Sequence, residues 1–116
     1  RFQYCIVPKL VLQPLVENAI IHGVADSDEG FIKLWAEEDN GDMLLYVSDN
    51  GPGIPEDVLR RLNNHETIPG SHLGLNNIDR IIRLYYGPAY GLTAQVTEEG
   101  SLVCLRLPME KGEHHA

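Results

Sequence analysis

The chain is organised around one short loop, Asp49-Asn50-Gly51-Pro52-Gly53-Ile54-Pro55. The loop follows an apolar run at residues 43–47 that is typical of a β-strand. Glycine adopts backbone conformations closed to other residues and lets a ligand approach the main chain, whereas proline fixes φ. An Asp-x-Gly-x-Gly pattern at a strand end is also common in ordinary turns. The surrounding sequence must therefore decide between a turn and a ligand-binding loop.

Length and charge limit the classes of function. The 116 residues suffice for one domain with its own hydrophobic core. We expect this domain to span residues 1–110, with residues 111–116 as a disordered tail. There are 17 acidic and 9 basic side chains, giving a net charge of −8, and no run of Lys or Arg. A nucleic-acid partner is therefore not expected. A small phosphate ligand remains compatible with this charge, because backbone N–H groups at helix N-termini bind phosphate.

Two further features bear on the cellular location. Cys5 and Cys104 lie in apolar, strand-like runs without metal-ligand spacing, so we predict reduced, buried thiols of a cytoplasmic domain. No apolar run approaches the ~18 residues of a membrane span, and nothing resembles a signal peptide. We therefore expect no direct membrane contact from this domain. The alternation of Phe2, Tyr4 and Ile6 is already under way at the first residues, which suggests a piece of a longer protein.

Hydrophobic periodicity and turn residues predict an α+β fold. Pro14 interrupts the first helical pattern, so we expect a kink or restart near Gln13-Pro14 and a helix end at Gly23. The expected elements are a strand at 2–7, a helix at 9–22, strands at 31–37 and 43–48, a short helix at 56–64, a loop at 65–71, a helix at 73–85, and strands at 91–97 and 101–107. This order predicts a two-layer sandwich, with a mixed, mostly antiparallel sheet and its helices on one face.

The strand at 31–37 carries two alternating sets of residues. One set is apolar and should face a covered side of the sheet, namely Ile32, Leu34 and Ala36. The other set holds the only tryptophan, Trp35, which we interpret as a packing residue at a sheet edge or interface rather than as a platform for a ligand. The pair Asn40-Gly41 predicts a tight hairpin to the next strand.

Two more motifs stand at fixed distances from the opening loop. Asn18-Ala19-x-x-His22-Gly23 lies on the predicted first helix, with Glu17 beside it, and Gly70-x-x-x-Gly74-Leu75 opens the helix at 73–85. Asn18 and His22 are four residues apart and so share one helix face. For a helix considered alone, Glu17, Asn18 and His22 are equally explained as its solvent-exposed side. Each motif is a weak signal by itself.

Together, in this order, the motifs resemble the nucleotide site of the ATP-binding family that includes histidine kinases, DNA gyrase, the ninety-kilodalton heat-shock chaperone and MutL. The segment Leu12-Gln13-Pro14-Leu15-Val16-Glu17-Asn18-Ala19-Ile20-Ile21-His22-Gly23 resembles the asparagine box of two-component sensor histidine kinases of the LytS/YesM type. The opening loop resembles the first glycine box, and Gly74-Leu75-Asn76-Asn77-Ile78 with Leu84-Tyr85-Tyr86-Gly87 resembles the second. The resemblance covers nearly the whole chain and implies the Bergerat ATP-binding fold.

The resemblance also implies a role for each matching residue. Asn18 would coordinate Mg²⁺, and Asp49 would accept a hydrogen bond from the exocyclic amine of adenine. The cofactor-binding set would be Asn18, Asp49, Gly51, Gly53, Ile54, Gly70, Leu73, Gly74 and Leu75, with backbone N–H groups of the second box holding the phosphates. Glu17 and His22 would act at the metal and phosphate end as catalytic residues. For His22, a hydrogen-bonded histidine at a helix terminus is an equal alternative.

The implied function is that of an ATP-binding catalytic domain that uses ATP and Mg²⁺ to phosphorylate a histidine. That histidine would lie on an upstream dimerisation domain, and the phosphoryl group would pass to a response regulator. The parent protein would be a membrane-anchored bacterial sensor with this domain in the cytoplasm, and the domain alone would be inactive as a kinase.

ATP-hydrolysing relatives carry a glutamate four residues before the metal asparagine, where this chain has Pro14. We therefore expect weak ATPase activity. His72-Leu73 also departs from the second box of many histidine kinases.

Two alternatives remain open at this stage. A non-catalytic nucleotide-binding regulatory module would bind ATP or ADP without transfer, but adenine binding alone does not require a metal ligand such as Asn18. A serine kinase of the anti-sigma-factor type shares the fold. The asparagine-box residues and Leu84-Tyr85-Tyr86-Gly87 favour the histidine kinase.

Overall fold

The computed structural model describes residues 9–20, 30–67 and 73–108. Its elements are α1 (Lys9–Ala19), β1 (Ile32–Asp39), β2 (Asp42–Asp49), α2 (Glu56–Asn63), α3 (Leu73–Tyr86), β3 (Gly91–Val96) and β4 (Ser101–Pro108). Three expectations fall outside the described residues: the strand at 2–7, the helix end at Gly23 and the disordered tail at 111–116. All the other predicted helices and strands are present, with boundaries shifted by one or two residues, except that the first helix is described only as far as Ala19. Of the predicted loop at 65–71, only residues 65–67 are described.

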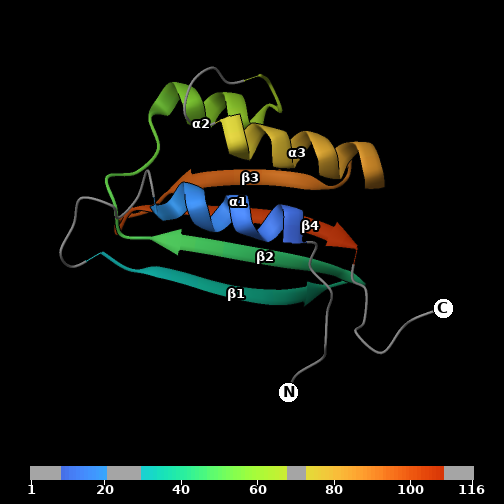
Figure 1. Ribbon diagram of the computed structural model, residues 1–116, viewed down its shortest axis with the longest axis horizontal. Coiled ribbons are helices and arrows are strands. Elements are labelled where there is room, and N and C mark those ends of the chain that lie inside the picture. The colour runs from blue at the N-terminus through green and yellow to red at the C-terminus, as the bar shows by residue number, and fades with distance from the viewer. Residues whose placement is uncertain (1–8, 21–29, 68–72, 109–116) are drawn as a thin grey trace.

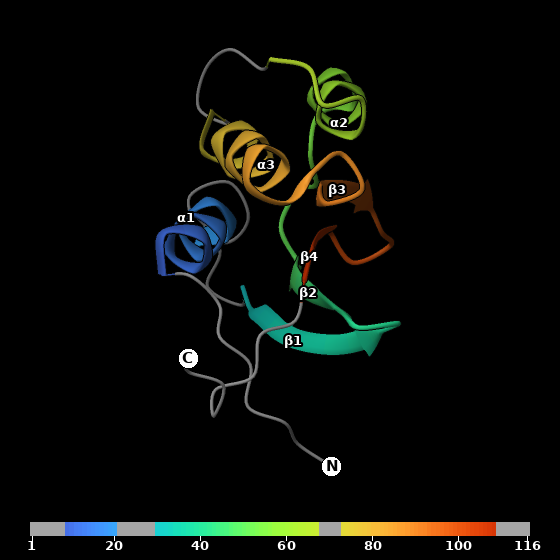
Figure 2. The same ribbon diagram turned by 90° about the vertical axis from the view of Figure 1, so that its right-hand side faces the viewer.

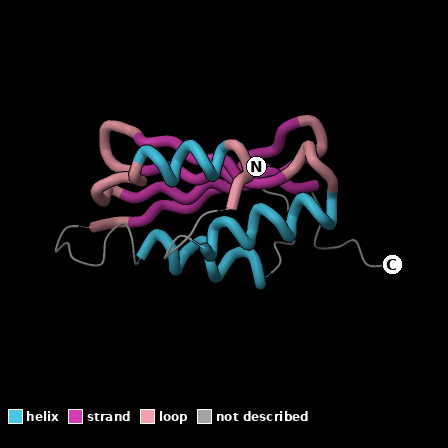
Figure 3. The backbone as a smooth tube through the Cα atoms, turned by 90° about the horizontal axis from the view of Figure 1, so that it is seen from above, coloured by secondary structure: helices cyan, strands magenta, loops and turns pink. Residues whose placement is uncertain are grey.

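The strands form one sheet in the order β1-β2-β4-β3. Every pairing among the described strands is antiparallel, so the parallel part of the predicted mixed sheet is not seen there. Helices α1 and α3 lie side by side over the same face of the sheet (Figures 1, 2 and 3). Helix α2 lies above β3, at the edge of the sheet (Figure 2). The structure thus has the predicted α+β arrangement in two layers.

The hairpin between β1 and β2 has the tight turn predicted from its sequence. Asn40 and Gly41 both have positive φ, at 53° and 87°, as a two-residue type I′ turn requires. The pairing runs without a break from Asp39 opposite Asp42 to Ile32 opposite Asp49. The turn therefore fixes the register that places Asp49 at the end of β2.

The core lies between the sheet and the helices α1 and α3. Alternate residues of β2 and β4 are buried against them, together with side chains of the two helices: Met43, Leu45, Val47, Val103, Leu105, Leu107, Leu15, Ala19, Leu75, Ile78 and Ile82. This period of two in the strands and of three to four in the helices is the pattern that the sequence predicts. The opposite face of the sheet has no helix over it in the described part of the chain (Figure 2).

Strand β1 departs from the predicted burial. Leu34 is 44% exposed and Ala36 is exposed, because the described helices cover β2, β4 and β3 rather than this edge strand. Only Ile32 of the predicted apolar set packs against the core. Trp35 stacks on Tyr46 with 5.0 Å between ring centroids, which confirms its predicted packing role at the sheet edge.

Helix α1 runs through Pro14 as one helix. Of the expected kink or restart, the restart is therefore wrong, and the kink stays a prediction. A proline inside a helix removes one backbone hydrogen bond and costs about 3 kcal/mol. Leu15 and Ala19 on the same helix are 2% and 3% exposed in the core, and the burial of such apolar side chains offsets a cost of this size. Tertiary packing therefore overrides the local signal.

Cys104 is partly exposed, contrary to the prediction of a buried thiol. It lies on the helix-free face of β4, opposite Tyr46 of β2. Partial burial still raises the pKa of the Cys104 thiol above its ordinary value, so the thiol stays protonated near neutral pH. Cys5 lies outside the described residues.

The outer edge of β3 is closed by side chains from the helices. The Asn63 amide group of α2 accepts from the Ala94 N–H at 2.8 Å and donates to the Ala94 carbonyl at 2.8 Å. The Asp79 carboxylate of α3 accepts from the Leu92 N–H at 2.8 Å and also bonds His65 Nδ1 at 2.9 Å. Asp79 is 3% exposed and therefore needs these partners. The two residues tie both helices to the sheet edge.

Candidate functional site

The three chain segments that carry the predicted motifs meet at one end of the molecule, together with the start of β4. Helix α1 ends there, helix α3 begins there, β2 ends there and β4 begins there (Figure 1). Asn18, Asp49 and Gly74 are thereby placed on three different elements at the same end. The antiparallel course of the strands and helices explains this convergence of residues that are distant in sequence.

Asp49 is the buried acidic residue of this end. Its residue exposure is 6%, and its Oδ1 accepts a hydrogen bond from the Gly51 N–H at 2.8 Å. Its Oδ2 accepts from the Ser101 hydroxyl at 2.7 Å, and Ser101 is equally buried. Each carboxylate oxygen has two lone pairs, so both can still accept from a ligand. The carboxylate is thus held in one orientation with acceptor capacity to spare.

Backbone contacts fix the loop that follows Asp49. Gly53 has a φ of +92°, a conformation that strains other residues. The Asn50 side-chain oxygen accepts from the Phe31 N–H at 2.8 Å and so ties the loop to the start of β1. Gly100, in the β3–β4 turn, lies directly against the backbone of Asp49 and Asn50. Ile54 is half-buried and packs against the core, so the loop holds one shape before any ligand arrives.

The predicted catalytic and metal residues on α1 have different environments. Asn18 is half-buried near the helix end. Glu17 is exposed and accepts a hydrogen bond from Gln13 Nε2 at 3.2 Å, so it lies on the solvent side of the helix. His22 lies outside the described residues.

The start of α3 holds the second glycine motif. Leu73 is the first residue of the helix, and Gly74 follows it as an exposed residue. No atom of the described residues outside the helix backbone lies within 4 Å of the place where a Cβ would stand. Leu75 is completely buried in the core, so only its backbone can face a ligand. Gly70 lies outside the described residues. Among the described residues, packing does not require a glycine at position 74, which is compatible with the predicted ligand contact there.

The described side chains offer few ligands for a metal ion. Within residues 9–20, 30–67 and 73–108, no three His, Cys, Asp or Glu side chains cluster as metal ligands. The amide oxygen of Asn18 is a hard ligand that suits Mg²⁺, but one such ligand does not hold the ion. Phosphate oxygens of a nucleotide would have to complete the coordination. The residues therefore fit a metal that arrives with a phosphate ligand.

Comparison with known proteins identifies the family. The model for the histidine kinase-, DNA gyrase B- and HSP90-like ATPases matches residues 7–111. The chain belongs to this family. It is 33% identical over 108 residues to the sensor histidine kinase YpdA of Escherichia coli K12, covering 92% of this chain and 19% of YpdA. It is 34% identical over 108 residues to the sensor histidine kinase YesM of Bacillus subtilis 168, covering 91% of this chain and 18% of YesM.

Solved structures support the same family at the level of fold. The catalytic domain of histidine kinase ThkA superposes with a TM-score of 0.68 at 26% identity, over 84% of this chain and 63% of that one. ThkA in complex with the response regulator TrrA superposes with a TM-score of 0.66 at 26% identity, over 90% of this chain and 29% of ThkA. This chain spans about a fifth of the length of YpdA and YesM. No helix in its described residues is long and apolar enough to cross a membrane.

Sequence reasoning missed two residues at this end of the ATPase-family domain. Ser101 bonds the Asp49 carboxylate, and Gly100 makes room for the Asp49 backbone. Their importance follows from the pairing of β2 with β4, which sets Asp49 opposite Ser101. Nothing in the local sequence around Ser101 specifies that pairing. A serine directly after Glu98-Glu99-Gly100 is otherwise an ordinary hairpin residue.

Proposed function

We propose that this chain is the ATP-binding catalytic domain of a sensor histidine kinase. The Asp49 carboxylate carries the proposal, because it is buried at a strand end and held by the Gly51 N–H and the Ser101 hydroxyl. A fixed, buried carboxylate accepts from the exocyclic amine of adenine, whereas a guanine carbonyl at that place would face it without a donor. The family membership and the sensor kinases YpdA and YesM support the same function.

The phosphates would lie between α1 and the start of α3. Backbone N–H groups at the first turn of α3 are unpaired within the helix and favour a negative charge. A bound Mg²⁺ would neutralise phosphate charge, with Asn18 as its protein ligand, while Glu17 and His22 would act at this same end. The cofactor-binding set would include Gly51, Gly53, Ile54, Gly70, Leu73, Gly74 and Leu75.

For phosphoryl transfer, the main task of this domain would be to position the nucleotide. A histidine nitrogen of an upstream dimerisation domain would attack the γ-phosphorus, the bond from that phosphorus to the β–γ bridging oxygen would break, and ADP would leave. Holding the nucleotide in line and neutralising its charge is the main requirement. Pro14, four residues before Asn18, cannot activate a water molecule. The domain would therefore conserve ATP until the histidine is presented.

The parent protein would be a membrane-anchored bacterial sensor with this domain, residues 1–110, on the cytoplasmic side. A response regulator would receive the phosphoryl group from the histidine. ThkA, which shares this fold, has been solved in complex with the response regulator TrrA. That complex supports a regulator as the partner of this chain as well.

Asn18→Ala is expected to remove the stimulation of nucleotide binding by Mg²⁺. The affinity for ADP without Mg²⁺ should stay near that of the unchanged domain, while the affinity with Mg²⁺ should fall about tenfold, or about 1.4 kcal/mol. Calorimetric titration with and without Mg²⁺ measures both values. Asn64→Ala, which changes an exposed asparagine outside the predicted motifs, is the matched control and should bind like the unchanged domain. If Mg²⁺ stimulates ADP binding as much in the Asn18 variant as in the unchanged domain, Asn18 is not a ligand of the metal.

Gly74→Ala is expected to raise the stability of the domain but to lower its affinity for ADP. A Cβ has free space at this exposed helical position, so the melting temperature of the nucleotide-free domain should rise by a few degrees, for about 0.5–1 kcal/mol. The same methyl group would occupy the space over the first turn of α3, so ADP affinity should fall by about tenfold. Thermal melts and titrations test the two effects separately. Unchanged ADP affinity in the stabilised variant would mean that the phosphates do not approach Gly74.

The kinase activity itself is tested on the full-length protein that carries this domain. Incubation with labelled ATP and Mg²⁺ should give a protein phosphate that is lost in acid and stable in base, as expected of phosphohistidine. An acid-stable phosphate would instead indicate a serine kinase. Nucleotide binding without any protein phosphate would indicate a regulatory module.

A further inference from the structure

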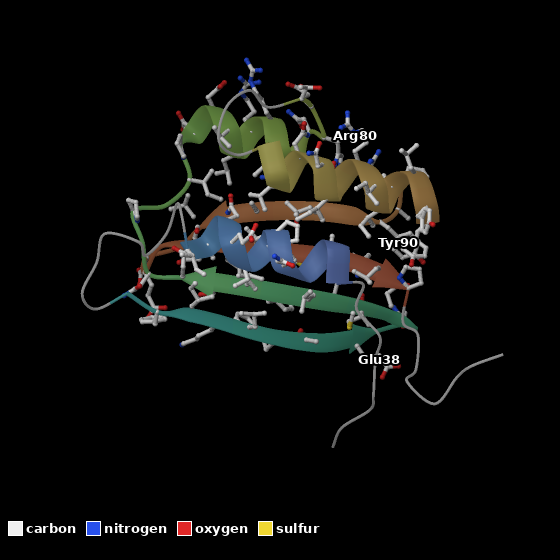
Figure 4. All side chains as sticks on the ribbon, in the orientation of Figure 1. Glu38, Arg80 and Tyr90 are labelled. Atoms are coloured by element: carbon white, nitrogen blue, oxygen red, sulfur yellow. The ribbon has the colours of Figure 1, made fainter. Side chains whose placement is uncertain are left out.

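Strand β1 forms an edge of the sheet, and no other strand lies beyond it in the described part of the chain. It is first in the sheet order β1-β2-β4-β3, and its six central residues are all exposed. Glu38, near the end of the strand, lies at this outer margin (Figure 4). The edge at β3 differs, because side chains of α2 and α3 bond its backbone. The β1 edge can therefore pair with a further strand.

The hairpin turn determines which backbone groups of β1 face outward. Residues that flank a two-residue turn form a hydrogen-bonded pair, and such pairs alternate along an antiparallel ladder with pairs that are not hydrogen-bonded. Asp39 flanks the turn, so the N–H and C=O groups of the odd-numbered residues of β1 point to β2. The Phe31 N–H points the same way, since it bonds the Asn50 side chain just after β2. The outward backbone groups belong to Ile32, Leu34, Ala36 and Glu38.

The side chains of β1 are complementary to those of a second, antiparallel β1. Lys33 and Glu37 lie two residues on either side of Trp35, and no ion pair engages either of them among the described residues. If Trp35 lies opposite Trp35 of a second copy, each Lys33 lies opposite a Glu37. The outward-facing Leu34 then lies opposite the outward-facing Ala36, as the backbone bonds require. A shift of two residues in either direction would place Trp35 opposite a charged residue instead.

We propose that two copies of this domain associate by antiparallel pairing of their β1 strands about a twofold axis at Trp35. The two sheets become one, with the helices of both copies on the same side. Each Trp35, which stacks on Tyr46 within its own copy, gains an aromatic neighbour across the axis. Two pairs of Lys33 with Glu37 flank this contact. Because the same strand supplies both members of each pair, a second copy is the partner that fits.

Self-association of the 116-residue chain is measured by sedimentation equilibrium. A contact of one strand from each copy is small, so we expect a weak dimer with a Kd of about 100 µM. The net charge of −8 on each copy opposes the contact, so the measurement uses about 0.15 M salt, where screening acts over about 8 Å. Since the edge at β3 is closed, association should stop at the dimer.

Charge exchange tests the register of the two strands. Lys33→Glu and Glu37→Lys should each weaken self-association at least about tenfold, because like charges then lie opposite one another. An equimolar mixture of these two variants should dimerise about as tightly as the unchanged domain, since every charged pair across the contact again has opposite signs. Glu56→Lys makes the same change of charge at an exposed position on α2 and should dimerise normally.

A backbone substitution tests the pairing itself. Ala36→Pro removes an outward-facing N–H that β2 does not use, so the domain should stay folded by circular dichroism while the dimer is lost. A dimer that persists in this variant, or that the mixture does not restore, would place the contact elsewhere and overturn the proposal. A monomer at all concentrations up to about five times the expected Kd would also overturn it. If removal of residues 1–7 then allowed dimers to form, the occupant of the edge would be this chain's own N-terminal segment.

Discussion

Asp49→Asn is expected to lower the affinity for ADP about 100-fold while the domain stays folded. A hydrogen bond to a charged group contributes about 1.5–3 kcal/mol, and 1.4 kcal/mol is a factor of ten in affinity. The asparagine oxygen can still accept from the Gly51 N–H, and its NH₂ group can donate to the Ser101 oxygen. The same NH₂ group would then face the amine of adenine as a second donor. The fold is preserved but the ligand contact is lost.

The measurement is a calorimetric titration with ADP, accompanied by circular dichroism and a thermal melt. Asp57→Asn is the matched control, because Asp57 is an exposed aspartate whose partners are Arg60 and Arg61 on its own helix. That variant should bind ADP normally. If Asp49→Asn binds ADP as well as the unchanged domain does, Asp49 is not the adenine contact.

Gly100→Ala is expected to damage both the fold and the site. A Cβ at residue 100 would collide with the Asp49 carbonyl oxygen and would stand 2.9 Å from both Asn50 Cα and Gly51 N. These are backbone atoms, so the β3–β4 turn and the loop must move apart. Overpacking of this kind costs about 3 kcal/mol, which should lower the melting temperature by more than about 10 °C. The displaced loop should also lose most of its ADP affinity.

A second glycine provides the control. A Cβ at Gly91 would stand 2.6 Å from Asp79 Oδ1, so Gly91→Ala should also destabilise the domain, but at the opposite end of β3. ADP affinity is measured at a temperature where both variants are folded by circular dichroism. Gly91→Ala should then bind nearly as well as the unchanged domain. A comparable ADP affinity in the two variants would show that the contact with Gly100 does not shape the nucleotide loop.

Local chemistry explains why so much of the fold could be predicted. Asn40-Gly41 specifies a two-residue turn through backbone conformations that few other residues adopt, and the structure has that turn. The apolar run at residues 43–47 and the helical spacing at 73–85 predict a strand and a helix, and the structure has both, as β2 and α3. In each case the information lies within a few neighbouring residues.

The predictions fail where a residue's environment depends on segments that are distant in the sequence. Leu34 is exposed because the described helices cover the other strands rather than β1. Pro14 is tolerated inside α1 because that helix packs against the core. Ser101 reaches Asp49 through a strand pairing across 52 positions, which no local pattern encodes. The motifs predict a nucleotide site at Asp49, and the structure adds that the carboxylate itself helps to shape the loop through the Gly51 N–H. Asp49 therefore helps to organise the loop, and under the proposed function it would also face the adenine.

The bonds of Asn63 and Asp79 to β3 also affect how copies of this domain meet one another. A free strand edge offers N–H and C=O groups on which another chain can add a strand, the first step of sheet-like aggregation. The N–H groups of Leu92 and Ala94 and the carbonyl of Ala94 are already occupied by side chains of the same chain. This side of the sheet thus resists strand addition without needing a charged or proline residue on the strand. The protection persists only while α2 and α3 stay docked, so partial unfolding that releases either helix opens the edge to association.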